Sequence, residues 1–152
     1  MNKNLWILKV LEAVAFGATC PKSAVGAIFV SLDYEILATG FNGAPRHLPH
    51  CEDTGCEKDK DGKCVTSVHA EINALVQGAK KGVILEGAML FVSRWPCKRC
   101  AMMLANLNLA AIAVPATGRR NPEGEAVLLK ARIESLVVHV DGSMAPLSQS
   151  SV

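Results

Sequence analysis

The chain has 152 residues and a formal net charge of +2, and half of its residues are hydrophobic. This length predicts one domain with a substantial core, since a chain of this size buries roughly two-thirds of its unfolded surface. No apolar run approaches the roughly 20 residues of a membrane span, and the first residues lack the order of a signal peptide. A charge this small does not by itself indicate nucleic acid binding. We therefore expect a cytoplasmic protein without membrane contacts.

The first part of the chain predicts one helix and a β-hairpin. Apolar residues recur at helical spacing over 4–17, and Gly17 marks the end of that pattern. A dense β-branched and aromatic run over 25–30 is followed, after a short turn, by a second strand over 35–41. The continuous apolar character of the first strand indicates burial on both faces, and therefore a sheet between layers of helices.

The later part of the chain alternates helices with strands. The helices are expected at 70–81, 97–109 and 123–131, and the strands at 88–93, 110–114 and 136–140. This alternation predicts parallel crossovers, which together with the hairpin give an α/β fold with a mixed five-stranded sheet. Residues 1–141 are expected to form one domain, and the Ser-rich tail 142–152 is expected to be disordered.

Residues 42–66 form a long connection without periodicity, which is uncommon in a compact domain unless the segment is functional. Cysteines in a cytoplasmic protein more often bind metals than form disulfides. We therefore predict a structural zinc site that orders this loop, with four protein ligands. Free, reduced thiols in a flexible loop are the alternative. The candidate ligands are Cys51, Cys56 and Cys64, with Cys20 as the fourth and His50 and His47 as its rivals.

Two short motifs point to a second zinc site, with a different chemistry. A His-x-Glu sequence occupies 69–71 and a Pro-Cys-x-x-Cys sequence occupies 96–100, and each begins a predicted helix. His69, Cys97 and Cys100 would bind zinc and leave the fourth tetrahedral position to water. Zinc makes such a water acidic, and Glu71 would move its proton. A Cys-x-x-Cys motif alone could be redox-active, but the combination is the signature of zinc nucleobase deaminases.

Further motifs make the likeness more specific. They are Thr-Cys-Pro at 19–21, Val-Gly-Ala at 25–27, Gly-Phe-Asn-Gly-Ala-Pro at 40–45 and the cysteines within 50–64. With the two zinc motifs, the sequence resembles bacterial and phage deoxycytidylate deaminases over roughly residues 1–114. The resemblance implies a three-layer α/β/α fold that hydrolyses dCMP to dUMP and ammonia. It also implies a homo-oligomer and dCTP and dTTP as allosteric effectors.

The resemblance also assigns roles to individual residues. Glu71 would be the acid/base and not a zinc ligand: hydroxide attacks C4 of cytosine while Glu71 protonates N3 and then the leaving amino group. Asn42 would hold the sugar or phosphate, although Asn42-Gly43 is also a good turn signal. Trp95 could equally be a hydrophobic plug. The residues expected to contact the substrate base are Ala70, Ser93, Arg94 and Trp95.

Arginines outside these motifs are candidates for phosphate binding. Arg46 is one because a guanidinium can bind two phosphate oxygens at once, with a solvated loop charge as the alternative. Residues 65–68 lack the Arg-Thr pair of related bacterial sequences, and 115–122 replace a Tyr- and Asp-containing segment. Arg119 and Arg120 could replace the phosphate contacts that are lost. These departures bear on monophosphate specificity and effector control, not on the zinc chemistry.

Two other functions remain as alternatives to dCMP deamination. One is a zinc deaminase of another nucleoside, base or small heterocyclic amine, and the other is a non-catalytic, zinc-stapled binding module. Glu71 argues against the binding module, since a module without turnover would not need an acid/base at this position. Editing of nucleic acid is disfavoured, because the chain has seven aromatic residues and no basic stripe interleaved with them.

Overall fold

The computed structural model describes residues 1–147, and a mixed β-sheet forms its centre. The strands are β1 (Gly26–Val30), β2 (Ile36–Phe41), β3 (Met89–Val92), β4 (Ala111–Pro115), β5 (Glu134–Val138) and β6 (Met144–Pro146). They lie in the order β2-β1-β3-β4-β5-β6. β1 pairs antiparallel with β2 and β3, whereas β3, β4 and β5 run parallel. The predicted hairpin and the parallel crossovers are confirmed.

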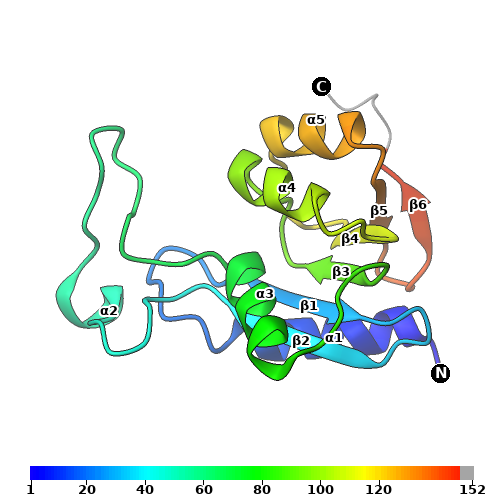
Figure 1. Cartoon of the computed structure of the whole chain (residues 1–152), viewed down its shortest axis with the longest axis horizontal. Helices are drawn as coiled ribbons and strands as arrows, with labels where there is room; N and C mark the ends of the chain where they lie inside the picture. The colour runs from blue at the N-terminus through cyan, green and yellow to red at the C-terminus, as the bar shows by residue number, and fades with distance from the viewer. Residues whose placement is uncertain (148–152) are drawn as a thin grey trace.

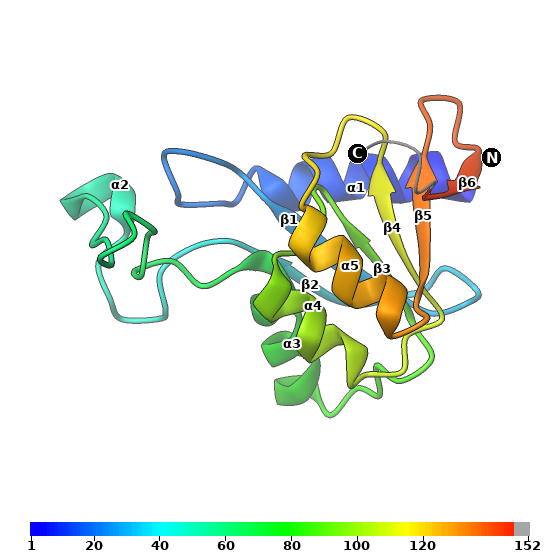
Figure 2. The same cartoon turned by 90° about the horizontal axis from the view of Figure 1, so that it is seen from above.

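Helices cover both faces of this sheet, as Figures 1 and 2 show. α1 (Lys3–Ala15) lies on one face, where Ile7 and Leu11 pack into a core with β1, β3 and β4. The other face is covered by α3 (Ala70–Lys81), α4 (Lys98–Ala105) and α5 (Pro122–Lys130). β1 and β3 are buried on both faces, which explains their continuous apolar sequences. The predicted α/β/α layering is therefore confirmed.

The expectation of a five-stranded sheet is wrong in one detail, because β6 adds a sixth strand. β6 pairs antiparallel with β5 and lies within the tail for which disorder was expected. Asp-Gly is a strong hairpin signal, and here Gly142 has a φ of 82° while the Asp141 carboxylate accepts a bond from the Ser143 N–H at 2.9 Å. The turn was not predicted, because the Ser-rich composition of the tail indicated disorder instead. The rest of the predicted tail, 148–152, lies outside the described residues.

One predicted helix is shorter than expected. The pattern over 97–109 yields α4, which ends at Ala105 with Asn106 as its C-terminal cap. Asn108 has a φ of 51°, a left-handed conformation that a continuing helix does not allow. Leu109 remains buried because the chain turns here toward β4. Apolar residues therefore occur beyond the end of the helix, which made the predicted helix too long.

The long connection after β2 projects from the body of the molecule (Figures 1 and 2). It contains the short helix α2 (Cys51–Thr54), which the sequence analysis did not predict. Between residues 44 and 69, Cys51 alone is buried. At its base, Gly43 and Val68 pair across the loop through two backbone hydrogen bonds of 3.1 and 2.8 Å. The segment leading to α3 is thereby held beside the end of β2.

Close packing of α3 on β2 determines where α3 begins. A Cβ atom at Gly40 would lie 2.2 Å from the Ala74 nitrogen and 2.5 Å from the Ala70 carbonyl oxygen. Only glycine permits this approach, since real Cβ atoms do not come so near to backbone. α4 begins after β3, two strands away from β2. Among the described residues, no helix is both long and apolar enough to cross a membrane.

Candidate metal centre and substrate pocket

The N-termini of α3 and α4 bring the two sequence motifs together. His69 is the N-terminal cap of α3, Cys97 is that of α4, and Cys100 lies in the first turn of α4. His69 Nδ1 lies 3.5 Å from Cys97 Sγ and 3.4 Å from Cys100 Sγ. The three donor atoms lie within 4.8 Å of one another.

The spacing of these donors fits a zinc ion. With Zn–N and Zn–S bonds of about 2.0 and 2.3 Å, tetrahedral angles place a nitrogen and a sulfur ligand about 3.5 Å apart. Both His69–cysteine distances agree with this value. His69 stays exposed, so a ligand from solvent has access to the cluster. Among residues 1–147, no fourth side chain joins this group, so one tetrahedral position would be left for water.

The electrostatics of the cluster also favour a cation. Hydrogen bonds from Cys100 and His69 lower the pKa of the Cys97 thiol, and the bond to Cys97 raises the pKa of His69. The Cys100 pKa is raised, because its hydrogen bond to Cys97 and its burial disfavour a second thiolate. A divalent cation would remove that penalty and allow both cysteines to ionise.

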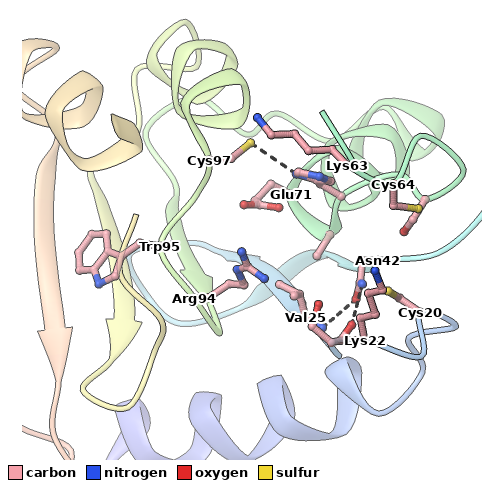
Figure 3. Close-up of a pocket in the computed structure, with 15 residues that line it drawn as sticks. Cys20, Lys22, Val25, Asn42, Lys63, Cys64, Glu71, Arg94, Trp95 and Cys97 are labelled. Atoms are coloured by element: carbon pink, nitrogen blue, oxygen red, sulfur yellow. Dashed lines mark hydrogen bonds between the residues drawn. The ribbon is translucent and has the colours of Figure 1, made fainter. Parts of the chain in front are cut away.

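Glu71 lies one residue inside α3, beside the cluster but outside its donor group (Figure 3). Only 3% of its surface is exposed, and this burial raises the pKa of its carboxyl group. Arg94 and His69 act in the opposite direction. A buried carboxyl next to an open metal position can take a proton from water and return it to a substrate.

These residues open into a cavity of about 330 Å³. This volume is at the lower end of the range for small-molecule sites. Several expected substrate residues line it, namely Asn42, Ala70, Arg94 and Trp95, together with His69, Glu71 and Cys97. The Trp95 ring points away from Glu71 in Figure 3 and packs in the core with 2% of the residue exposed. The geometry therefore favours the hydrophobic-plug alternative for this ring.

Two other expected substrate residues are not part of the pocket wall. The Ser93 hydroxyl accepts a 3.0 Å hydrogen bond from the Gly26 N–H, which places it against β1. Arg46 is exposed on the loop and does not line the cavity. Ser93 was expected from the family resemblance and Arg46 from the chemistry of its guanidinium, and neither signal carries information on which side chains reach the cavity.

Asn42 is buried, with both ends of its amide bound to the backbone of the preceding loop. Its Oδ1 accepts a 2.7 Å bond from the Val25 N–H, and its Nδ2 donates to the Ser23 carbonyl at 2.8 Å. The amide therefore fixes the segment that leads into β1. A contact between Asn42 and the sugar or phosphate stays a prediction. One lone pair of Oδ1 and one hydrogen of Nδ2 are not used by these two bonds and remain for such a contact.

Several residues of the pocket wall were not predicted from the sequence. Lys22, Ser23, Gly62 and Lys63 line the cavity from two separate loops. A single lysine in a polar loop has no distinguishing signal, because most such charges are solvated. Their common position follows from the fold alone.

Cys51, Cys56 and Cys64 form a second donor cluster in the projecting loop. Cys51 Sγ lies 3.8 Å from Cys64 Sγ, which equals the spacing of about 3.8 Å between two thiolates on one tetrahedral zinc. Partial burial raises the pKa of Cys64, but hydrogen bonds with the Ser67 and Thr66 backbone and with the other two thiols lower it overall. The hydrogen bond with Cys56 and burial raise the pKa of Cys51 to about 12, a penalty that a bound cation would remove. The three thiols thus fit a metal.

The expected fourth ligands of this second cluster lie elsewhere. Cys20 is not part of the donor group and lines the substrate cavity instead. His50 uses its Nδ1 in a 2.8 Å hydrogen bond with Thr19 Oγ1, and His47 is exposed. His50 lies directly before α2, and its ring is not part of the donor group.

Arg120 is also unavailable for the phosphate contact considered from the sequence. It binds both carboxylate oxygens of Glu125, at 2.7 and 2.6 Å, near the start of α5. The Arg119 carbonyl accepts a 3.0 Å bond from the Trp95 N–H. This segment therefore braces the chain just before Cys97, and neither arginine lines the cavity.

Comparison with known proteins agrees with this geometry. The model of the cytidine and deoxycytidylate deaminase zinc-binding region matches residues 1–116. The chain belongs to this deaminase family. It is 28% identical over 144 residues to ComE operon protein 2 of Bacillus subtilis, which covers 95% of this chain and 75% of that protein. The deoxycytidylate deaminase of Mycobacterium phage D29 is 32% identical over 123 residues, covering 72% of this chain and 91% of the phage enzyme.

A solved deaminase structure is also similar. The dCMP deaminase of cyanophage S-TIM5, crystallised with dCMP and dUMP, matches with a TM-score of 0.75 and 30% identity. The match covers 87% of this chain and 93% of the phage protein. The predicted membership of the deoxycytidylate deaminase group within the zinc-dependent cytidine deaminases is confirmed.

Proposed function

We propose that this protein hydrolyses dCMP to dUMP and ammonia. The observation that supports this most is the position of Glu71, buried at the bottom of a cavity beside the His69, Cys97 and Cys100 donors. The similarity to phage dCMP deaminases, one of them bound to dCMP and dUMP, supports the choice of substrate.

The residues divide the chemistry between them. Zinc held by His69, Cys97 and Cys100 would lower the pKa of a water near the base. Glu71 accepts the proton of the water that attacks C4, and gives a proton to N3. Glu71 then takes the remaining water proton from the C4 hydroxyl and transfers it to the amino group, so that ammonia leaves as the C4–N bond breaks and the C4 carbonyl forms. Its raised pKa suits a group that must both accept and return protons.

The first experiment is ammonia release from zinc-loaded protein with dCMP, CMP, deoxycytidine, cytosine and adenosine. We expect turnover of dCMP well above that of the other compounds. Preferred turnover of an unphosphorylated compound would assign the protein to another deaminase specificity. No turnover of any compound, with zinc bound, would favour the non-catalytic binding module.

A second zinc in the projecting loop is also part of the proposal, because Cys51, Cys56 and Cys64 have the spacing of zinc ligands. Cys56→Ser should reduce the zinc content from two ions per chain to one and lower the melting temperature. Unchanged zinc content and stability would rule out the loop site. Cys20→Ser is the matched control, since Cys20 lies outside the cluster and this variant should keep both ions. Loss of an ion in the control would instead make Cys20 a ligand.

Regulation and assembly complete the proposal. The family resemblance implies dCTP and dTTP as effectors and a homo-oligomer, and the assay with dCMP can be repeated with each nucleotide present. Activation by dCTP and inhibition by dTTP would support regulation, and light scattering would give the subunit number. Indifference to both nucleotides would indicate that the changed 115–122 segment does not support regulation.

A further inference from the structure

The side chain of Asn73 ties the first turn of α3 to the end of β2. Its Nδ2 donates a hydrogen bond of 2.7 Å to the carbonyl oxygen of Phe41, the last residue of β2. The Asn73 main-chain N–H donates to the His69 carbonyl at 3.0 Å and closes the turn that contains Glu71. Asn73 therefore joins the turn that carries a predicted metal ligand and the acid/base residue to the central sheet.

The backbone of Phe41 is a firm point of attachment because it is paired within the sheet. Phe41 lies opposite Gly26 of β1. The Gly26 N–H donates to the Ser93 hydroxyl, and the Gly26 carbonyl accepts from the Ser93 N–H, both at 3.0 Å. Ser93 directly follows β3 and begins the segment that leads to Cys97. The bond from Asn73 thus aligns the start of α3 with the strand ends that precede the cysteine motif.

Two other contacts between this part of the chain and the end of β2 do not use the Asn73 side chain. Gly40 permits the close approach of the Ala74 backbone, and Gly43 and Val68 are joined by two backbone hydrogen bonds. Close packing sets the distance between helix and strand, whereas a hydrogen bond is directional and sets where along the strand the helix lies. Replacing Asn73 therefore leaves the packing in place and removes the directional contact.

The two elements that this bond connects both supply side chains to the substrate cavity. Glu71 lies two residues before Asn73 on α3, and Asn42 directly follows Phe41; both line the cavity (Figure 3). Asn73 itself is not part of the cavity wall. Its bond therefore sets how the acid/base residue lies relative to the wall that would hold a substrate. A displacement of about 1 Å at a reacting group can lower the rate about 10²-fold.

We propose that Asn73 is a positioning residue, which keeps Glu71 aligned with a substrate bound in the cavity. This proposal rests on the proposed deamination, in which Glu71 moves protons between water, N3 and the amino group. Asn73 acts through α3 and does not touch the substrate. Loss of its bond to Phe41 should lower kcat far more than it changes KM, because the groups that bind the substrate stay in place while proton transfer is misaligned.

The test replaces the amide donor by a group of the same shape. Asn73→Asp presents a carboxylate, which can only accept, to the Phe41 carbonyl. At about pH 8, kcat for dCMP should fall about tenfold, with KM and zinc content nearly unchanged. As the pH is lowered, the protonated carboxyl can donate to Phe41 again, so the ratio of variant to wild-type kcat should rise. Gln77→Glu is the matched control, because Gln77 is a half-buried amide on the same face of α3, one turn farther on.

A second variant and a measurement without turnover complete the test. Asn73→Ala removes the donor without adding a carboxylate, so its kcat should also fall but show no recovery in acid. Amide hydrogen exchange over residues 69–73 should be faster in both Asn73 variants than in Gln77→Glu.

The outcomes separate this proposal from the proposed function. Unchanged kcat in both Asn73 variants, or a raised KM with kcat retained, would overturn the positioning role. If wild type prefers another substrate to dCMP, only the choice of substrate fails, and the same comparison is made with that compound. If wild type deaminates none of the compounds, the proposed function fails and the positioning role fails with it.

Discussion

The surroundings of Glu71 shift the pKa of its carboxyl group in opposite directions. Burial raises the pKa of its carboxyl, whereas His69 and Arg94 favour the ionised form. The N-terminus of α3 adds a partial positive charge that also stabilises a carboxylate. A group balanced in this way changes its protonation state at low cost, which is the property that an acid/base residue needs.

Glu71→Gln tests this role directly. The amide keeps the shape of the side chain but cannot carry the proton, so we expect turnover to fall by about 10²–10⁴-fold with zinc content unchanged. The measurements are ammonia release and metal analysis on the same preparation. Glu123→Gln, also in the first turn of a helix but exposed, is the control. A fully active Glu71→Gln enzyme would contradict the assignment.

The Arg120–Glu125 pair makes stability depend on pH. The hydrogen bond from Arg120 lowers the pKa of the Glu125 carboxyl below its unfolded value. Its stabilisation is therefore present above the unfolded pKa and is lost as the pH falls through the folded pKa. Glu125→Gln should lower the free energy of unfolding by about 1 kcal/mol or less at pH 7, because Arg120 is partly exposed. Urea titrations from pH 7 downward should show that the difference shrinks as the pH falls.

α5 packs very close to the Pro-Cys-x-x-Cys motif at 96–100. A Cβ atom on Gly124 would lie 1.8 Å from the Pro96 carbonyl oxygen and 3.2 Å from the Cys97 carbonyl carbon. The absence of a side chain at this position lets α5 lie against the backbone that holds Cys97 at the start of α4. α5, which carries none of the predicted catalytic residues, thereby positions Cys97, a predicted metal ligand.

Gly124→Ala should consequently destabilise the protein, although alanine is the better helix former. We expect a loss of about 1–3 kcal/mol, as for other overpacked sites, and faster loss of zinc to a chelator, since Cys97 must shift. Gly78→Ala in α3 is the control, because its new Cβ would meet the movable end of Leu85. Equal behaviour of both variants would show that α5 does not position the ligand.

Across the whole molecule, one donor cluster lies on the packed α/β body and the other lies in a loop without a hydrophobic core. His69, Cys97 and Cys100 stand on helices that pack on the sheet, whereas Cys51, Cys56 and Cys64 belong to a loop outside both hydrophobic cores. A segment without a core must be ordered by hydrogen bonds or by a metal. The loop also supplies Lys63 to the cavity, so its order bears on substrate binding.

Chelation should therefore affect the two parts differently. Removal of zinc is expected to expose residues 44–66 to proteases first, because the loop has little buried surface, while the far-ultraviolet circular dichroism of the α/β body stays nearly unchanged. Limited proteolysis with mass spectrometry, before and after chelator, measures this. Loop cleavage that is equally fast with and without zinc would contradict a metal-ordered loop.

Most elements could be predicted because their signals are local. The pattern over 70–81 gave the bounds of α3, and the continuous apolar run at 25–30 identified β1 and its burial. The predicted bounds were wrong where a turn signal was masked by the composition of the residues around it. Apolar residues continued past the end of α4 at Ala105, and serines obscured the Asp141-Gly142 turn before β6.

The sequence by itself determined the chemistry, since the types and short spacings of His69, Glu71, Cys97 and Cys100 identify the deaminase family. Only the tertiary structure decided which distant residues share the site. It brought Lys22 and Lys63 to one cavity, kept Ser93 and Arg46 out of it and set Cys20 apart from the loop thiols. The physical reason is that such distances depend on packing between elements, as where Gly40 lets α3 lie on β2, and no spacing along the chain encodes them.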